Sequence, residues 1–351
     1  MIIIGCDFHT RYQQIAMADD ETGELLLERR LDHESGEAHA FYRSLQGPVR
    51  VGIEATGPIH WFERLLAELG HELWIGDSAK IRASEVRKQK TDERDARLIL
   101  DLMLAKRFPK IWVPTPAERD LRQLLWHRHK LVCLRTMLGN QLHFLAMSQG
   151  LCRKQKLFTK KGRVELSGLA LGPWASRRRE ELLQLLDQVD APIAELDRAV
   201  LEEAQGRDDA VLLMTHPGIG PVTSLAFVLA IGPVTRFRRS KEIASYLGLN
   251  PSEESSGGKR RLGAISKQGN TMVRWLLIET VHHAVRQDPA LRQDYQRLKF
   301  RRGHAVAKVA IARKLAVRMY WMLRGGADYA QLVRRQGSPG PTLVDANPSL
   351  G

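Results

Sequence analysis

The spacing of apolar residues changes near residue 114, and this change divides the chain into regions with different folds. Residues 1–113 alternate short apolar runs, such as "MIIIGCD" and "VRVGIEA", with amphipathic segments such as "HWFERLLAEL". Two runs that flank "ETG" predict a β-hairpin, and the alternation after them predicts β-α-β units. A hairpin followed by β-α-β units implies a mixed sheet flanked by helices, so we expect an α/β domain at 1–113.

Strand signals stop after residue 114. Between 114 and 207, apolar residues keep helical spacing through "AERDLRQLLWHRHKLVCLRTMLGNQLHFLAM" and "RREELLQLLDQVDAPIAELDRAVLEEA", which a basic connector joins. These stretches predict a helical hairpin or coiled-coil arm. Because two helices alone bury little apolar surface, we expect the arm to self-associate. Residues 208–325 predict a mostly α C-terminal domain, and 326–351, with "QGSPGPT" and no periodicity, predict a disordered tail.

The charge of the chain indicates a nucleic-acid partner. Lys and Arg number 54 against 40 Asp and Glu, a net charge of +14, and a hydrophobic content of 43% supports packed cores. No apolar run reaches the roughly 18–20 residues that span a bilayer. The N-terminus lacks the basic start of a signal peptide, and the three scattered cysteines argue against a disulfide framework. We therefore expect a cytoplasmic protein without a membrane partner.

Four acids occupy positions that could serve catalysis. Asp7 and Glu54 end two predicted strands, where functional groups collect in α/β sheets. Asp92 and Asp95 share one face of a helix start. Each acid also has a local explanation, such as capping by Thr91 and acids in a first helical turn. If that helix packs across the sheet, the carboxylates converge, and bound Mg²⁺, with Mn²⁺ as an alternative, would offset their repulsion and activate phosphodiester chemistry. This order of acids resembles the ribonuclease-H and RuvC-like nucleases.

The C-terminal domain contains a glycine turn and basic segments. "HPGIGPVTS" places Gly218 and Gly220 in a turn that opens a helix, where backbone N–H groups can bind phosphate as in helix-hairpin-helix modules. An ordinary turn between helices is the alternative. The segments "RFRRSK", "KRR" and "SKQGN" are expected to contact phosphates through Arg238, Arg239, Lys259, Arg260, Arg261 and Lys267.

The segment "SEESSGGKRRL" has the ingredients of a phosphodiester nucleophile. Ser255 and Ser256 precede two glycines and a basic triplet, so a hydroxyl can approach DNA closely and cations can stabilise charge on phosphorus. The alternative is a flexible basic loop that clamps phosphates electrostatically. Spacing alone favours the clamp.

The motifs "GCDFHT", "GIEATG", "KTDERDA", "PGIGPVTS" and "LGLNPSEESSGGKRRLGAISKQGN", in this order, resemble transposases of the insertion-sequence 110 family, also called DEDD-type transposases. The resemblance runs from Met1 to about Gly325. It implies a RuvC-like domain whose four acids are Asp7, Glu54, Asp92 and Asp95. It also implies a nucleophilic serine, assigned to Ser255 with Ser256 as the alternative.

In that family the serine joins covalently to a DNA phosphate while the acids and Mg²⁺ assist. The resemblance further implies donor and target DNA, a structured guide RNA from the element, and a prokaryotic, nucleoid-associated location. With the self-associating arm, we expect a homodimer or homotetramer.

Two other functions fit parts of the pattern. A RuvC-like junction resolvase would cut DNA with metal-activated water and form no covalent intermediate. A non-enzymatic basic DNA-binding protein would carry the acids as structural groups, and the four-acid pattern counts against it. Detection of a covalent protein–DNA adduct separates all three.

Overall fold

The computed structural model describes residues 1–57, 59–84, 91–153, 155–253 and 261–337. These residues form two compact units, Met1–Val113 and Pro114–Gly351. Four residues of the expected site lie outside the described residues: Ser255, Ser256, Lys259 and Arg260.

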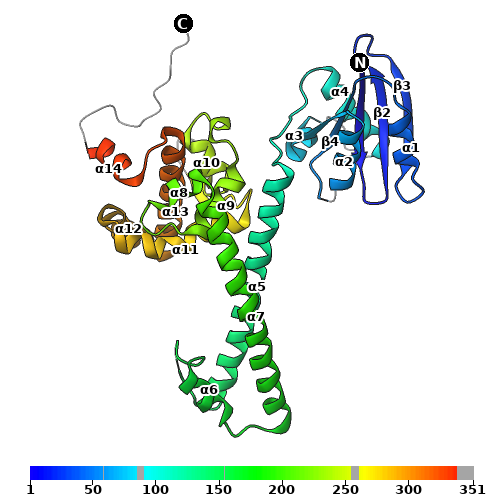
Figure 1. Ribbon diagram of the computed structural model, residues 1–351. Helices are drawn as coiled ribbons and strands as arrows, with labels where there is room; N and C mark the ends of the chain where they lie inside the picture. The colour runs from blue at the N-terminus through cyan, green and yellow to red at the C-terminus, as the bar shows by residue number, and fades with distance from the viewer. Residues whose placement is uncertain (58, 85–90, 154, 254–260, 338–351) are drawn as a thin grey trace. The chain divides into compact units, whose positions relative to one another are not determined.

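The first unit is a sheet with helices on both faces (Figure 1). Its strands are β1 (Ile2–Phe8), β2 (Tyr12–Asp19), β3 (Leu25–Asp32), β4 (Val49–Glu54) and β5 (Glu72–Gly76). Its helices are α1 (Glu37–Ser44), α2 (His60–Glu68), α3 (Ser78–Ala83) and α4 (Asp92–Leu104). The strand order is β3-β2-β1-β4-β5. β1–β2 and β2–β3 are antiparallel, whereas β1–β4 and β4–β5 are parallel, which confirms the predicted mixed sheet.

The central strand β1 is buried on both faces of the sheet. Because successive side chains of a strand point to opposite faces, neighbouring residues of β1 meet different helices. Ile3 belongs to the apolar cluster that contains the buried face of α4. Ile4 and Cys6 belong to the cluster that contains the buried residues of α1 and α2. The sheet is therefore the middle layer of three, with α4 on one side and α1 and α2 on the other.

Gly5 sets how closely α4 approaches β1. A Cβ atom on Gly5 would collide with the carbonyl oxygen of Ala96 and the backbone nitrogen of Leu100. The missing side chain therefore brings the α4 backbone directly onto the strand. Asp7 lies two residues after Gly5 and so faces the same helix.

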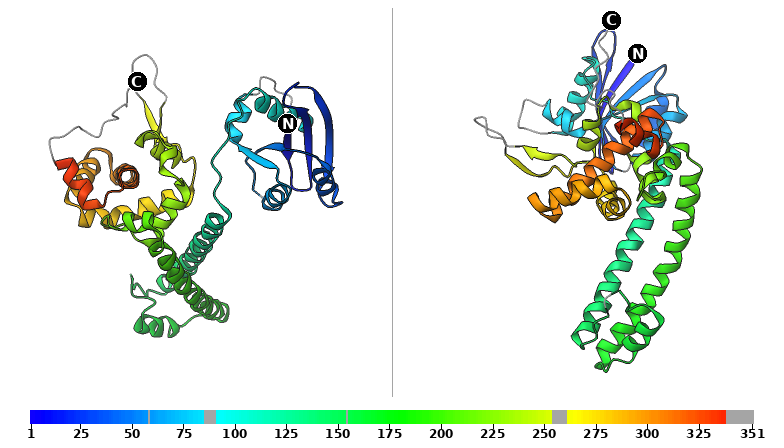
Figure 2. Two further views of the ribbon diagram at one scale, coloured as in Figure 1. Left: turned by 45° about the horizontal axis from the view of Figure 1, so that its top comes forward. Right: turned by 90° about the vertical axis from the view of Figure 1, so that its left-hand side faces the viewer.

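The second unit begins with two long helices, α5 (Pro116–Ser148) and α7 (Pro173–Gln205), which are each 33 residues long and run antiparallel (Figure 2). Their distal halves share an apolar cluster that includes Leu138 and Leu142 from α5 and Leu186 and Val189 from α7. The connector between them contains the short helix α6 (Lys160–Ser167).

The remaining elements have a core that contains α9 (Pro221–Ile231), which is buried from Thr223 to Ile231. They are α8 (Asp208–Met214), η1 (Val234–Arg236), α10 (Ser240–Tyr246), β6 (Pro251–Glu253), β7 (Leu262–Ile265), α11 (Thr271–Gln287), α12 (Pro289–Arg302), α13 (His304–Gly325) and α14 (Tyr329–Gly337). Leu125 of α5 and Val200 and Ala204 of α7 belong to the same core as these helices. The base of the long helix pair is thus continuous with the C-terminal bundle.

The structure corrects the prediction of a disordered tail from residue 326. Residues Tyr329–Gly337 form α14, and Leu332 is buried against the core of the unit. The Tyr329 hydroxyl donates a hydrogen bond to Asp288 Oδ2 at 2.8 Å. Tyr329, Leu332 and Val333 have the spacing of one helix face, which the prediction overlooked, and these tertiary contacts stabilise the helix. Residues 338–351 lie outside the described residues.

Candidate active site

Asp7 and Glu54 lie side by side at the carboxyl end of the sheet. In the parallel pairing of β1 with β4, Cys6 is opposite Ile53, so the next residues of the two strands are Asp7 and Glu54. The Asp7 side chain is 15% exposed, whereas that of Glu54 is 31% exposed. This edge is where loops leave room for ligands in α/β folds.

The start of α4 faces this edge. The Thr91 side chain accepts a hydrogen bond from the backbone N–H of Arg94, so Thr91 caps the helix, as expected from its sequence. Asp92 is the first residue of α4, and Asp95 lies one turn later. The local explanation for these acids therefore holds, and it does not exclude a second role, because the same helix packs against β1 through Gly5.

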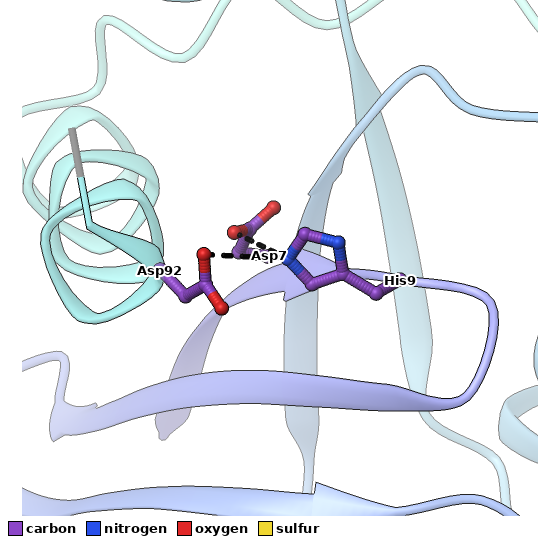
Figure 3. A group of neighbouring side chains, drawn as sticks. All are labelled: Asp7, His9 and Asp92. Atoms are coloured by element: carbon purple, nitrogen blue, oxygen red, sulfur yellow. Dashed lines mark hydrogen bonds and ion pairs between the residues drawn. The ribbon is translucent and has the colours of Figure 1, made fainter.

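His9, from the loop after β1, joins the carboxylates of Asp7 and Asp92 (Figure 3). Its Nε2 atom lies 3.0 Å from Asp7 Oδ2 and 3.6 Å from Asp92 Oδ1. On the other side, the Tyr12 hydroxyl donates a hydrogen bond to Asp92 Oδ2 at 2.8 Å. The Tyr12 ring in turn lies under the Arg30 guanidinium. Aromatic and imidazole groups of the β1–β2 hairpin thus orient both carboxylates.

The electrostatics of Asp7 reflect this crowding. Burial raises the pKa of the Asp7 carboxyl above its ordinary value, and the nearby imidazole of His9 opposes that rise. The negative charges of Asp95 and Asp92 raise the pKa of Asp7 further. Asp95 is therefore close enough to act on Asp7 through its charge. A bound cation would relieve this repulsion.

Glu54 has a different partner from the one expected. Its Oε1 atom lies 3.7 Å from Nη2 of Arg82, an exposed side chain in the last turn of α3. Among the described residues, the group with ligand atoms within 4.8 Å of one another consists of Asp7, His9 and Asp92. The structure therefore brings together two of the four predicted acids, adds a histidine, and leaves Glu54 on the adjacent strand.

The donor set fits a divalent cation. Two carboxylates are ligands suited to Mg²⁺ and Mn²⁺, whereas imidazole is more typical of zinc and iron sites. Because His9 Nε2 lies within ion-pair distance of both carboxylates, it occupies the position between them where a cation would contact both. The residues present are therefore compatible with a metal held by Asp7 and Asp92.

The glycine turn of the second unit connects α8 with α9. Gly218 has a φ of 87°, and a Cβ on it would approach the backbone nitrogen of Ala284 in α11 to 2.6 Å. Its conformation and the close packing both require glycine. Gly220 precedes α9 as its N-cap, and a Cβ there would meet open space. Tight packing thus accounts for Gly218, while Gly220 leaves the start of α9 accessible.

The described basic residues of the expected interface are exposed. Arg238 and Arg239 precede α10, Arg261 precedes β7, and Lys267 follows it. Strands β6 and β7 pair as an antiparallel hairpin. The segment that contains Ser255 and Ser256 connects these two strands in the sequence, so both ends of it belong to one hairpin.

Sequence reasoning missed His9 and Tyr12. Both belong to "GCDFHTRY", and the signal was present, because a histidine two residues after a strand-end acid is close to it in any tight hairpin. The pairing with Asp92, 83 residues from His9 in the chain, depends on the packing of α4 and has no local signal.

A mixed α/β unit with acids at a sheet edge, followed by a mostly helical part, is consistent with a RuvC-like fold joined to a helical unit. A family model of DEDD-type IS110 transposases matches residues 4–146, and one described as "Transposase IS116/IS110/IS902 family" matches residues 210–296. The chain therefore belongs to the IS110 family of insertion-sequence transposases, which are DNA transposases and recombinases.

Curated proteins similar to this chain also carry the name transposase. A "Probable family 20 transposase" of Pseudomonas aeruginosa is 31% identical over 297 residues, covering 81% of this chain and 86% of that protein. The "Transposase for insertion sequence element IS1111A" of Coxiella burnetii is 28% identical over 322 residues, covering 88% and 86%. Among the described residues, no helix combines the length and apolarity needed to cross a membrane.

Proposed function

We propose that this transposase exchanges DNA strands at specific sites through a covalent serine–DNA phosphate intermediate, assisted by Mg²⁺ at Asp7, Glu54, Asp92 and Asp95. The observation that supports the metal site most directly is the convergence of Asp7 and Asp92 on His9 Nε2. A structured guide RNA that pairs with donor and target DNA is part of the proposal and rests on the family resemblance.

The residues of the first unit have distinct tasks in this proposal. Asp7 and Asp92 hold the cation, the His9 imidazole leaves the position between them when the cation binds, and the Tyr12 hydroxyl keeps Asp92 oriented. The negative charge of Asp95 repels the Asp7 carboxylate and raises its pKa. A bound cation relieves this repulsion, so Asp95 strengthens cation binding. A bound Mg²⁺ would supply Lewis-acid activation of the phosphodiester.

The covalent step conserves the energy of the phosphodiester bond. The Ser255 hydroxyl oxygen forms a bond to phosphorus, and the bond between phosphorus and one deoxyribose oxygen breaks. The serine proton goes to a base, and the released deoxyribose oxygen becomes a hydroxyl. Attack by the hydroxyl of a second DNA end reverses these changes, so rejoining needs no nucleotide. The chain contains no GxxxxGK[ST] nucleotide-binding motif, which agrees with such a route.

The serine assignment is tested by trapping the adduct. Ser255→Ala should bind DNA normally and form no covalent adduct on a denaturing gel, whereas Ser256→Ala should have a much milder effect. Ser252→Ala is the matched control, because Ser252 is an exposed serine of β6 in the same hairpin. If adduct and recombination persist in both Ser255→Ala and Ser256→Ala, the serine is not the nucleophile.

The metal assignment is tested by neutralising single acids. Asp7→Asn or Asp92→Asn should abolish strand exchange while leaving the fold intact, because each removes a charge that the cation contacts. Asp101→Asn is the control, since Asp101 is an exposed acid at the other end of α4. Full strand exchange by Asp92→Asn with ordinary Mg²⁺ dependence would contradict the metal site.

DNA binding in this proposal uses the second unit. The accessible start of α9 at Gly220, together with the turn at Gly218, would contact a phosphate, as in a helix-hairpin-helix module. Basic side chains on the same unit would contact the DNA backbone: Arg238, Arg239, Lys259, Arg260, Arg261 and Lys267. These contacts position DNA without reading its sequence.

Self-association through an arm at residues 114–207 is the oligomeric part of the proposal. The helix α5 exposes a row of residues at alternating spacings of three and four, the spacing of a coiled-coil seam: Trp126, Lys130, Cys133, Met137, Asn140, Phe144 and Met147. Met137 is 51% exposed, Phe144 71% and Met147 61%. A second copy of the chain, as a dimer or a tetramer, would bury this row.

A junction resolvase that cuts with metal-activated water remains the second candidate. The acid cluster supports it equally well, because the cluster by itself does not require a covalent intermediate. Wild-type protein that cuts DNA without ever forming an adduct would favour this candidate over the serine route.

A further inference from the structure

Phe300, near the end of α12, is 94% exposed, the highest value among the exposed large hydrophobic side chains that the structure describes. Apolar aromatic side chains are usually buried, so such exposure on a well-packed helix indicates a surface that meets a partner.

The opposite face of α12 is anchored in the core. Leu291 and Tyr295 are buried, and Leu298 packs against the same cluster. Tyr295 Oη lies 2.6 Å from His304 Nδ1 of α13, which ties the end of α12 to the next helix. At about 100° per residue, Phe300 lies roughly 200° around the helix from Leu298 and therefore points outward. Phe300 thus points away from the core on α12, a helix at the periphery of its unit (Figure 1).

The charge around Phe300 has one sign. The segment 296–308, "QRLKFRRGHAVAK", contains five Lys or Arg and no Asp or Glu. Two of these cations are paired, Arg297 with Asp294 at 2.8 Å and Lys308 with Glu279 at 3.0 Å. No described residue forms an ion pair with the other three, which are Lys299, Arg301 and Arg302.

This combination fits a nucleic acid better than a protein or a membrane. The centre of a protein interface is depleted of charge, and a membrane surface would need several apolar side chains, whereas Phe300 is accompanied in this segment by Val306 alone, which is 53% exposed. A lone aromatic ring among cations is the arrangement that proteins use on unpaired strands, where the ring stacks on a base and the cations contact phosphates.

We propose that Phe300 stacks on a base of an unpaired DNA strand while Lys299, Arg301 and Arg302 contact its phosphates. The choice of DNA rests on the proposed function, because strand exchange requires that a DNA strand leave its duplex. This surface begins after residue 296, where the family match of the second unit ends.

The test measures equilibrium binding of the full-length protein to labelled oligothymidylate in EDTA, so that no cleavage occurs. Phe300→Ala should weaken binding about tenfold, because base–aromatic stacking contributes on that order. Phe300→Trp should retain the affinity, and Phe300→Leu, which is apolar but lacks a π face, should resemble Phe300→Ala. Trp174→Ala is the matched control, since Trp174 is 77% exposed on α7.

A second measurement tests the cations. Lys299→Gln combined with Arg301→Gln should reduce the slope of log affinity against log salt by roughly 0.7 for each phosphate that the protein no longer neutralises. Binding of the matching thymidine–adenine duplex should change much less in Phe300→Ala, because duplex bases are already stacked.

Four results would overturn the proposal. The first is an unchanged affinity of Phe300→Ala for oligothymidylate, and the second is an equal loss of affinity in Trp174→Ala. The third is tighter binding of oligouridylate than of oligothymidylate that depends on Phe300. The fourth is a smaller assembly of Phe300→Ala in light scattering with unchanged DNA affinity. The third would assign the surface to RNA, and the fourth to a protein interface. The binding assay in EDTA involves no cleavage, so failure of this proposal and failure of the cleavage mechanism are read separately.

Discussion

Replacement of Gly5 by alanine tests whether close packing of α4 on β1 builds the acid cluster. The new Cβ would collide with backbone atoms of Ala96 and Leu100, which cannot rotate away as a side chain can. The helix must therefore move outward. Because Asp92 and Asp95 occupy the first turn of α4, the same movement separates them from Asp7.

The size of the effect follows from that geometry. A carbon contact is most favourable near 3.5–4.0 Å, so relief of the collision requires a displacement on the order of 1 Å. Overpacking of this kind costs about 1–3 kcal/mol of folding free energy. A displacement of about 1 Å in a catalytic group can cost roughly 100-fold in rate. We expect strand exchange to decrease by about that factor, while the first unit stays folded.

Hydrogen exchange of peptides from β1 and α4 measures the local stability, and a recombination assay at saturating Mg²⁺ measures the rate. An opening free energy lower by about 1–3 kcal/mol corresponds to roughly 5–150-fold faster exchange. Gly57→Ala is the matched control, because a Cβ on Gly57 would meet no atom within 4 Å.

Wild-type exchange protection in α4 together with full recombination activity in Gly5→Ala would refute the packing argument. A loss of stability with full activity would show that α4 moves without carrying the acids away from Asp7. Equal effects from Gly57→Ala would mean that any added methyl group in this unit has the same consequence.

Three further predictions follow from other regions. Burial lowers the pKa of His216 to about 4, so between about pH 6.5 and 4 the unfolded chain binds a proton that the folded chain resists. The free energy of unfolding should therefore decrease by about 3 kcal/mol as the pH falls through this window, and denaturant titrations should show a smaller decrease in His216→Gln. Met137→Glu combined with Phe144→Glu should reduce the mass measured by light scattering, because charges would interrupt the exposed row on α5; an unchanged mass would place the interface elsewhere. Arg238→Gln and Arg239→Gln should each weaken DNA binding across sequences and reduce the salt slope by about one unit, whereas a sequence-selective loss would indicate base readout.

Local patterns were sufficient to predict the framework of the first unit. Short apolar runs predicted the strands, and a hairpin followed by β-α-β units predicted their mixed pairing, which the strand pairs confirm. The helix start at Asp92 was predictable because its cap, Thr91, is the adjacent residue. The order of the motifs along the chain also predicted the transposase family, which the family matches confirm.

The second unit shows where local patterns were not enough. Near the end of the chain, Tyr329, Leu332 and Val333 have helical spacing over a short segment, and α14 forms where Leu332 docks on the core and Tyr329 on Asp288. Helices as short as α14 gain most of their stability from such packing rather than from propensity. The helical spacing covers only nine residues, and the prediction of a disordered tail overlooked it.

Which groups meet at the active site was decided by the tertiary structure. The sequence determined that Asp7 ends a strand and that Asp92 begins a helix, because strand pattern and capping act over a few residues. It did not determine that His9 contacts both acids or that Glu54 pairs with Arg82. Those contacts depend on how α4 and α3 pack against the sheet. That packing depends on long-range steric fit, such as the missing Cβ of Gly5 beneath Ala96, which no local pattern encodes.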